Sequence, residues 1–149
     1  MTLAISTVMT SIASLTVAGV NIKDADEIPP SALRLTPILF PKPGATLSNF
    51  TVIRESFGGG SSALMNVEYD LTYLFLYCEA GSGRTGLDFE QDRIEKIQAI
   101  LDEVIEIDTI TGAVDILPVG NYEYVPLTDP AGNSYIGCEM TFHVIEFWR

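Results

Sequence analysis

The sequence predicts an α+β fold: a mainly antiparallel β-sheet with an N-terminal helix and one longer central helix. Two long stretches, 64–78 and 135–148, alternate between large apolar residues and others, which is typical of β-strands. Between them, residues 88–107 repeat apolar side chains at helical spacing. With 149 residues, 47% of them hydrophobic and 19% charged, the chain can bury a core as a single domain over 1–149.

The first long stretch, Leu64–Cys78, has two unequal faces. From Val67 to Tyr77 every second side chain is large and apolar, so this face is expected to lie in a core. The opposite face begins polar and ends apolar, with Asn66, Glu68, Asp70, Thr72, Leu74, Leu76 and Cys78 in order. We expect the polar half to meet solvent or an interface. The apolar half needs a cover, from the N-terminal helix or from a neighbouring subunit.

Shorter strand-like segments accompany these two stretches. They span 33–40, 49–55, 113–118 and 122–127, and turn signals rich in Pro, Gly, Asn and Asp separate them. The last stretch repeats the pattern of the first, with one apolar face formed by Ile136, Cys138, Met140, Phe142 and Val144. Because the two long patterns match, we expect their strands to be neighbours in one antiparallel sheet.

The first 20 residues carry no charge and predict a helix. A signal peptide requires Lys or Arg before its apolar run, and seven Ser or Thr residues interrupt what would have to be a membrane span. Apolar residues recur instead at helical spacing, at Ile5, Val8, Met9, Ile12 and Leu15. We therefore expect an amphipathic helix that docks on the sheet and ends at Gly19 or Asn21.

The central helix is predicted to begin at Asp88, where Gln91 completes a pattern like a capping box. Its apolar stripe consists of Ile94, Ile97, Leu101, Val104 and Ile105, and its other face carries Glu95, Asp102, Glu103 and Glu106, with Arg93 and Lys96 as counterweights. On a regular helix face without histidine, these carboxylates are better explained as a solvated surface than as a metal or acid–base site. Acid at the C-terminal end opposes the helix dipole, so it is expected to serve something other than helix stability.

The net charge of −12 argues against two classes of partner. Sequence-independent binding of nucleic acid requires clustered Lys and Arg, and an anionic membrane repels an acidic protein. The acid is concentrated in residues 88–115, which hold nine acidic and two basic residues. Such a charge permits high solubility, a basic partner, or a surface that must not adhere to DNA.

Two glycine-rich loops resemble phosphate-binding loops only superficially. No Lys-Ser or Lys-Thr follows the SFGGGSS loop at 56–62, and the GSGRTG loop at 81–86 lacks the GxGxxG spacing. The first is expected to be a flexible hairpin tip and the second a linker. An exposed aromatic residue in such a tip suits docking of a partner, which makes Phe57 a candidate contact.

Little in the sequence supports catalysis or a bound cofactor. His143, the only histidine, lies in a strand among hydrophobic residues, where most histidines are structural. No Ser lies in a GxSxG motif, and neither Cys78 nor Cys138 has a local partner that would activate a thiolate or complete a metal site. We interpret the cysteines as buried free thiols, with a disulfide between neighbouring strands as the alternative. We therefore expect no cofactor, no metal and no enzymatic activity.

Three segments carry a resemblance to a known family. They are VEYDLTYLFLYC, the helix RIEKIQAILDEVIEI, and the closing segment from Gly132 to Phe147, in which a turn is followed by Y-x-G and an alternating strand that ends in E-F. In this order and at this length, the chain resembles the tail terminator proteins (tail-completion or minor tail proteins) of long-tailed bacteriophages. The resemblance implies an α/β sandwich, in which helices pack on one side of a largely antiparallel sheet.

The same resemblance implies a virion structural protein. In that family a ring, usually of six subunits, caps the head-proximal end of the tail tube, stops tube polymerisation and joins the tail to the neck. Expected partners are copies of the chain itself, the tail tube protein and a neck or head-completion protein. DNA would pass through the lumen without sequence-specific binding, and no membrane is involved. The ring would be assembled in the host cytoplasm and reside at the tail–neck junction of the virion.

Two sets of residues are candidates for sites on such a ring. The candidate subunit or partner interface comprises Phe57, Gly58, Gly59, Gly60, Asn66, Glu68 and Asp70, and the candidate acidic lumen comprises Asp102, Glu103 and Glu106. Alternatives within the same assembly are another neck or head-closure protein, or a tail tube subunit, which would stack indefinitely. A small cytosolic α+β binding module or enzyme is the alternative from a different class.

Overall fold

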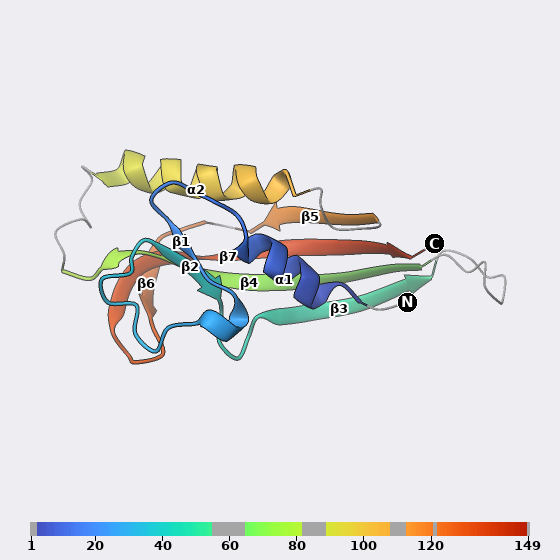
Figure 1. The fold of residues 1–149 in the computed structure, drawn as a ribbon, viewed down its shortest axis with the longest axis horizontal. Helices are drawn as coiled ribbons and strands as arrows, with labels where there is room; N and C mark the ends of the chain where they lie inside the picture. The colour runs from blue at the N-terminus through green and yellow to red at the C-terminus, as the bar shows by residue number, and fades with distance from the viewer. Residues whose placement is uncertain (1–2, 55–64, 82–88, 108–112, 121, 149) are drawn as a thin grey trace.

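The computed structural model describes residues 3–54, 65–81, 89–107, 113–120 and 122–148 (Figure 1). These residues form an α+β fold around a mostly antiparallel seven-stranded sheet, which confirms the predicted fold class. The helices are α1 (Ile5–Ala13), a short 3-10 helix η1 (Ala25–Glu27) and α2 (Glu90–Ile105). The strands are β1 (Asn21–Ile22), β2 (Ile38–Pro41), β3 (Leu47–Arg54), β4 (Met65–Glu79), β5 (Ala113–Val119), β6 (Val125–Thr128) and β7 (Ser134–Trp148).

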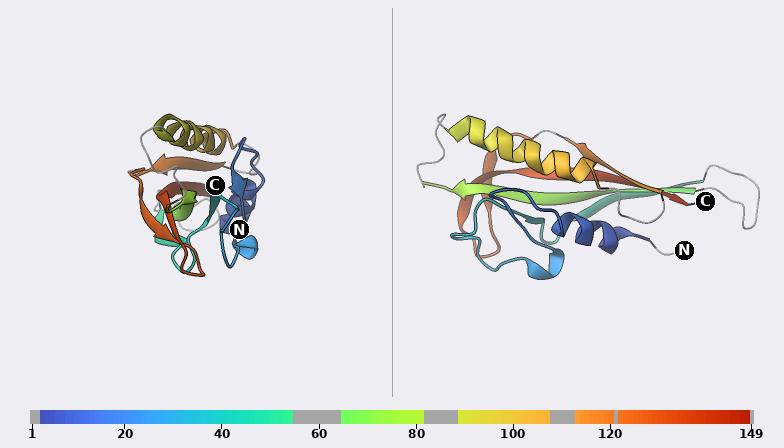
Figure 2. Two further views of the ribbon diagram at one scale, coloured as in Figure 1. Left: turned by 90° about the vertical axis from the view of Figure 1, so that its left-hand side faces the viewer. Right: turned by 45° about the horizontal axis from the view of Figure 1, so that its top comes forward.

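The two long strands β4 and β7 are neighbours at the centre of the sheet, as predicted. They pair antiparallel along almost their whole length, with Tyr69 opposite Val144. The strand order is β1-β2-β4-β7-β5, while β3 lies beside β4 and β6 beside β7. β3 flanks the first half of β4 and β2 the second half. The result is an elongated sheet (Figure 2), with β3 and β5 as the two edges of one end.

Both helices pack on one face of this sheet (Figure 1), as the resemblance implied. The core-facing side chains of β4 are the predicted alternating row, Val67, Tyr69, Leu71, Tyr73, Phe75 and Tyr77, and all of them are buried. β7 adds Cys138, Met140, Phe142 and Val144, and the helices add Val8, Ile12, Ile97, Ile100 and Val104. Removing this much apolar surface from water is the main driving force for the fold.

The other face of the sheet has a smaller core under the second half of β4. Leu74 and Leu76 pack there with Ala32, Ile38, Phe40 and Tyr135. Their cover is the proline-containing connector 28–35, so the expectation that α1 or a neighbouring subunit covers them is wrong. The reason is that α1 occupies the opposite face. The register shift between Leu76 and Cys78 also returns Cys78 to the helix-covered core, where it no longer needs that cover.

Asp129, in the turn before β7, fastens this connector to the sheet. Its buried carboxylate accepts hydrogen bonds from the backbone N–H of Ala32 at 2.8 Å and from the hydroxyl of Tyr135 at 2.7 Å. The backbone N–H of Asn133 donates a third, at 3.0 Å. Burial alone would raise the pKa of Asp129, but these hydrogen bonds outweigh it and hold the pKa well below its usual range. The turn therefore joins the connector to the start of β7.

The N-terminus of α1 is held by the sheet and not by its own side chains. The helix has no acidic residue in its first turn and no side-chain cap. The backbone N–H of Ala4 instead donates to both carboxylate oxygens of Glu146 on β7, at 3.1 Å each. Glu146 is buried and also accepts a hydrogen bond of 2.7 Å from the hydroxyl of Tyr69. A carboxylate in this position satisfies a free N–H group and offsets the helix dipole.

α1 is shorter than the sequence suggested. It ends at Ala13, with Ser14 as its C-cap, and not at Gly19 or Asn21. The hydroxyl of Ser14 donates to the backbone carbonyl of Thr10 at 2.8 Å. The backbone N–H of Ser14 donates to the same carbonyl at 3.0 Å, so this residue closes the last turn of the helix.

α2 turns most of its predicted stripe to the core, where Ile97 and Val104 are buried and Leu101 is partly buried. Its buried residues are Arg93, Ile97, Ile100 and Val104. Ile94 is 53% exposed and Ile105 is 61% exposed, although both were expected in the apolar stripe. The guanidinium of Arg93 lies 5.2 Å from the ring centroid of Tyr124 and 5.8 Å from that of Tyr77. Cation–π contacts therefore allow a charged residue to occupy a core position, while the two end residues of the predicted stripe lie outside the core.

α2 begins without the predicted capping box. Phe89 occupies the N-cap position and makes no side-chain capping hydrogen bond, while Asp88 lies outside the described residues. Glu90 and Asp92 in the first turn still place negative charge at the positive end of the helix, as predicted. The favourable interaction with the helix dipole is therefore kept although the cap is one residue later.

Candidate functional site

One half of the sheet face opposite the helices is left uncovered by the described residues. We use "open face" for this side of β3, β5, the first half of β4 and the second half of β7. Residues that lie opposite each other in the register share a face, so the row Thr51–Glu68–Ile145–Asp115 belongs to it. Neither described helix packs there, and the connector 28–35 covers only the other half. The polar half of β4 therefore meets solvent or an interface, as expected.

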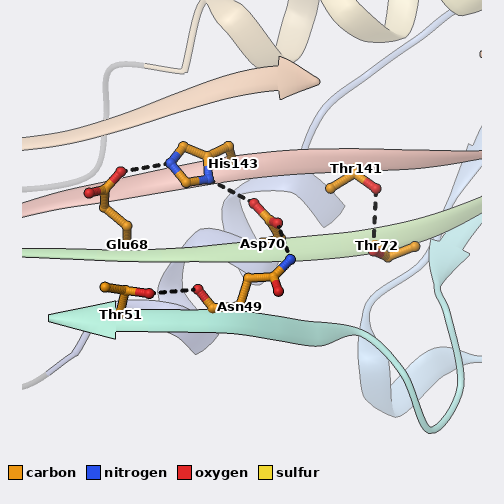
Figure 3. Close-up of polar contacts among 7 residues, drawn as sticks. All are labelled: Asn49, Thr51, Glu68, Asp70, Thr72, Thr141 and His143. Carbon is orange, nitrogen blue, oxygen red and sulfur yellow. Dashed lines mark hydrogen bonds and ion pairs between the residues drawn. The ribbon is translucent and has the colours of Figure 1, made fainter. Parts of the chain in front are cut away.

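His143 lies on the open face between two carboxylates of β4 (Figure 3). Its Nδ1 is 2.7 Å from Oδ1 of Asp70, and its Nε2 is 2.9 Å from Oε1 of Glu68. Ionised carboxylates only accept hydrogen bonds, so both ring nitrogens donate when the imidazole is protonated. The hydrogen bonds to Asp70 and Glu68 raise the pKa of His143 above its ordinary value, against the effect of partial burial. The three side chains form a charged bridge between β4 and β7.

This bridge agrees with the structural role predicted for His143. Both ring nitrogens are engaged by carboxylates, which leaves neither to accept a proton from a substrate. In the next row, the hydroxyls of Thr72 and Thr141 lie 3.4 Å apart and connect the same two strands (Figure 3). Cross-strand pairs of this kind stabilise the sheet itself.

Asn49 joins the cluster from the edge strand β3. The register of β3 shifts between Ser48 and Thr51, and Asn49 has a φ of 54°, a left-handed conformation that Asn adopts more readily than most residues. Its side-chain amide donates to Oδ2 of Asp70 at 2.7 Å (Figure 3). Sequence reasoning missed this contact, because an Asn within an alternating stretch does not by itself indicate a bulge.

β3 is exposed along its whole length. All eight of its residues are exposed. They include four large apolar side chains, Leu47 at 47%, Phe50 at 47%, Val52 at 53% and Ile53 at 43%. Among the described strands, β3 pairs only with β4, so the main-chain groups of its outer edge are open to a partner. An apolar edge strand of this kind is typical of an interaction surface.

The predicted interface residues of β4 lie next to this strand. Asn66, Glu68 and Asp70 are partly buried side chains on the open face, and β3 pairs with that part of β4. The structure thus brings the polar half of β4 together with the exposed edge of the sheet. The other candidates, Phe57, Gly58, Gly59 and Gly60, lie outside the described residues.

The predicted lumen acids lie on the helix side, away from the open face. Glu103 and Glu106 line a cavity of about 370 Å³ between α2 and α1. The other wall is formed by hydroxyl-bearing residues of the α1 segment, Thr7, Thr10, Ser11 and Ser14. Asp102 is exposed. The acid at the C-terminal end of α2 therefore faces hydroxyl groups of α1, and its role in a lumen stays a prediction.

Both cysteines are buried in the core. Cys78 and Cys138 are free and buried, as interpreted from the sequence. Burial raises the pKa of the Cys138 thiol to about 12, which keeps this thiol protonated and unreactive. Within the described part of the chain, no group of His, Cys, Asp and Glu side chains is arranged to hold a metal ion.

The described helices are short or carry many charges. None of them has both the length and the apolar content that crossing a bilayer requires.

In comparisons with known proteins, no family model matches this chain and no curated protein matches it significantly. The candidate site is defined by geometry alone and consists of strand β3 and the adjoining open face.

Proposed function

We propose that this chain is a virion structural protein that assembles with copies of itself into a ring, as a tail terminator of a long-tailed phage. The ring would cap the head-proximal end of the tail tube, stop tube polymerisation and join the tail to the neck, with DNA passing through the lumen. The observation that carries the proposal is the exposed apolar edge strand β3 beside the open face.

The exposure of β3 favours assembly over a solitary monomer. Leu47, Phe50 and Val52 lie on the helix side of the strand and Ile53 on the open face, so apolar groups protrude from both sides. Soluble monomers usually protect edge strands with charge, bulges or a covering segment, and β3 has only one bulge and one charged residue, Arg54. A closed ring covers this edge in every copy and leaves no edge free.

The charge of the chain supports a channel through which DNA slides. Acid occurs on both faces of the sheet, at Asp115 and Glu68 on the open face and at Glu103 on the helix face. With a net charge of −12 per copy, a ring repels phosphate groups and does not adhere to DNA.

Light scattering after size-exclusion chromatography, together with negative-stain electron microscopy of the purified chain, tests this function. We expect a closed ring with a mass that is a whole multiple of 16.2 kDa. When the ring is added to polymerising tail tube protein, elongation should stop. Long tubes formed by the chain alone would indicate a tube subunit, and a stable monomer at high concentration would contradict self-assembly.

A further inference from the structure

We infer that β3 of one copy pairs antiparallel with β5 of the next copy, so that one sheet continues from subunit to subunit. The inference rests on the self-assembly proposed above and specifies which two surfaces meet. We call them the β3 edge, Leu47–Arg54, and the β5 edge, Ala113–Val119. They are the two outer strands at the same end of the sheet.

The strand directions are compatible with this pairing. β3 runs antiparallel to β4, β4 to β7, and β7 to β5, so β3 and β5 run in opposite directions within one copy. A rotation about an axis along the strands keeps these directions in the next copy. The β3 edge then meets a β5 edge in antiparallel orientation, the more stable arrangement for a strand pair. Such a contact joins different surfaces of the two copies and can continue around a ring, whereas β3 against β3 would stop at a dimer.

The side chains on the helix face also match. On the helix face, the β3 edge presents Leu47, Phe50 and Val52, and the β5 edge presents Val114, Ile116 and Pro118. When the two edges pair, these residues form one continuous apolar row on the helix face. On the open face, the register places Thr51 level with Asp115 and Ser48 level with Leu117, which is 48% exposed. Cross-strand contacts among such residues are what stabilise a sheet.

α2 supplies a cover for the helix face of this contact. The Ile94 flank of α2 faces the chain after β5, since Ile94 lines a cavity of about 470 Å³ with Tyr122 and Tyr124. The flank that carries Glu103 faces α1. Ile105 follows Ile94 by about three helical turns and therefore lies on the Ile94 flank. Because α2 ends beside β5 (Figure 1), the 61% exposed Ile105 is placed over the β3 edge that would join there.

The charges of the two edges are complementary. The β3 edge carries Arg54 and no acidic residue, although the chain as a whole has a net charge of −12. The β5 edge carries Asp115 and no basic residue, and Glu90 and Glu123 line the neighbouring cavity. Arg54 lies on the helix face, opposite Met65, and Asp115 lies on the open face, so the two side chains do not pair directly. The opposite signs of the two strands still disfavour pairing of two identical edges.

Mixing two variants tests the pairing. The β3-edge variant carries Val52→Lys and Ile53→Lys, and the β5-edge variant carries Leu117→Lys and Val119→Lys; all four side chains are exposed, so each subunit should fold. Each variant alone should be monomeric. The loss of buried apolar anchors should raise the dissociation constant for self-association at least about 30-fold. A 1:1 mixture should give a heterodimer and nothing larger, because one intact β3 edge meets one intact β5 edge. Native mass spectrometry measures these masses.

The matched control carries Leu33→Lys, in the connector 28–35, and Val125→Lys, in β6, which add the same charge at exposed apolar positions outside both edges. This control should assemble like the wild type, and circular dichroism should show all three variants folded.

Self-association of the β5-edge variant alone would overturn the inference, since it would indicate β3 against β3. Unchanged oligomers in both edge variants would overturn it as well, by placing the contact elsewhere. Either result leaves the proposed function standing if the wild type forms a ring. A monomeric wild type would contradict both proposals. An open filament from the wild type, with the heterodimer in the mixture, would contradict the ring and support the pairing.

Discussion

The face of β4 that points away from the helices differs between the two halves of the strand. In the second half its side chains pack under the connector 28–35, and in the first half they form an ion-pair cluster around His143. The helix face of the strand is apolar and buried in both halves. The change from polar to apolar along the back of one strand therefore follows the presence of a cover. Where the cover is absent, the edge strand β3 is exposed too, which is why we place the subunit contact at that half.

The stability of the two halves depends on pH in opposite ways, because the pKa of Asp129 is lowered and the pKa of His143 is raised. Asp129 fastens the covered half, and its lowered pKa means that it stabilises the fold above its unfolded pKa and loses this effect as the pH falls. His143 bridges the open half, and its raised pKa means that it stabilises the fold below its unfolded pKa and loses this effect as the pH rises. The covered half is thus sensitive to acid, and the open half to alkali.

The largest expected effect comes from comparing a buried phenylalanine in the covered half with an exposed one in the open half. Phe40→Ala should lower the free energy of unfolding by about 3–5 kcal/mol, because Phe40, on β2 beside β4, is fully buried and its loss leaves a cavity. The matched change Phe50→Ala on the exposed edge should cost about 1 kcal/mol. Urea denaturation measures both, and equal losses would show that β3 is covered within the monomer.

The next effect tests the fastening of the connector. Asp129→Asn should lower the free energy of unfolding by about 2–3 kcal/mol at pH 7, because the amide cannot accept all the hydrogen bonds of the carboxylate. The difference from the wild type should shrink as the pH falls below about 4, the ordinary pKa of an Asp carboxyl. A difference that stays constant down to pH 2.5 would refute this role of the ionised form.

A glycine at the junction of the two halves tests their alignment. A Cβ on Gly137 would lie 2.0 Å from the backbone oxygen of Phe75, next to the register shift after Leu76. Gly137→Ala should therefore cost about 2 kcal/mol by forcing β4 and β7 apart. Gly44→Ala, at an open position with a φ of +74°, should cost only about 1 kcal/mol of backbone strain. Thermal denaturation of the two variants would rank them, and the reverse order would argue against close approach of the strands.

The smallest effect concerns the open half. His143→Gln should cost about 1 kcal/mol at pH 6, where the imidazolium bonds both Asp70 and Glu68. This cost should decline as the pH rises from about 6.5 through the raised pKa of the folded state. Glu139→Gln, which breaks the 2.7 Å ion pair with Lys42, is the control and should show no such pH dependence between pH 6 and 9.

The core rows of β4 and β7 could be predicted because a period of two persists along both strands. The burial of Arg93 on α2 could not, because Arg93 counts as polar in a sequence pattern and is buried here against Tyr77 and Tyr124. The cover over Leu76 was missed since the apolar residues of the connector 28–35 have no regular spacing.

The candidate site was predictable only in part. The polar back of β4 indicated solvent or an interface, as found at Glu68. The exposure of β3 was not foreseen, because Phe50 and Val52 alternate as in any half-buried strand. Whether such residues are buried depends on how far the helices extend over the sheet, and local sequence does not contain that distance.

The central position of β7 has a consequence for biosynthesis. The strand separates β4 from β5, and its Glu146 holds Ala4, which is 142 residues earlier in the chain. On the ribosome, α1 and the tyrosine-rich row of β4 emerge long before residues 134–148 exist to pair with them. We therefore expect nascent chains that stop before residue 134 to stay open to protease and to chaperones, and the fold to form late and in one step.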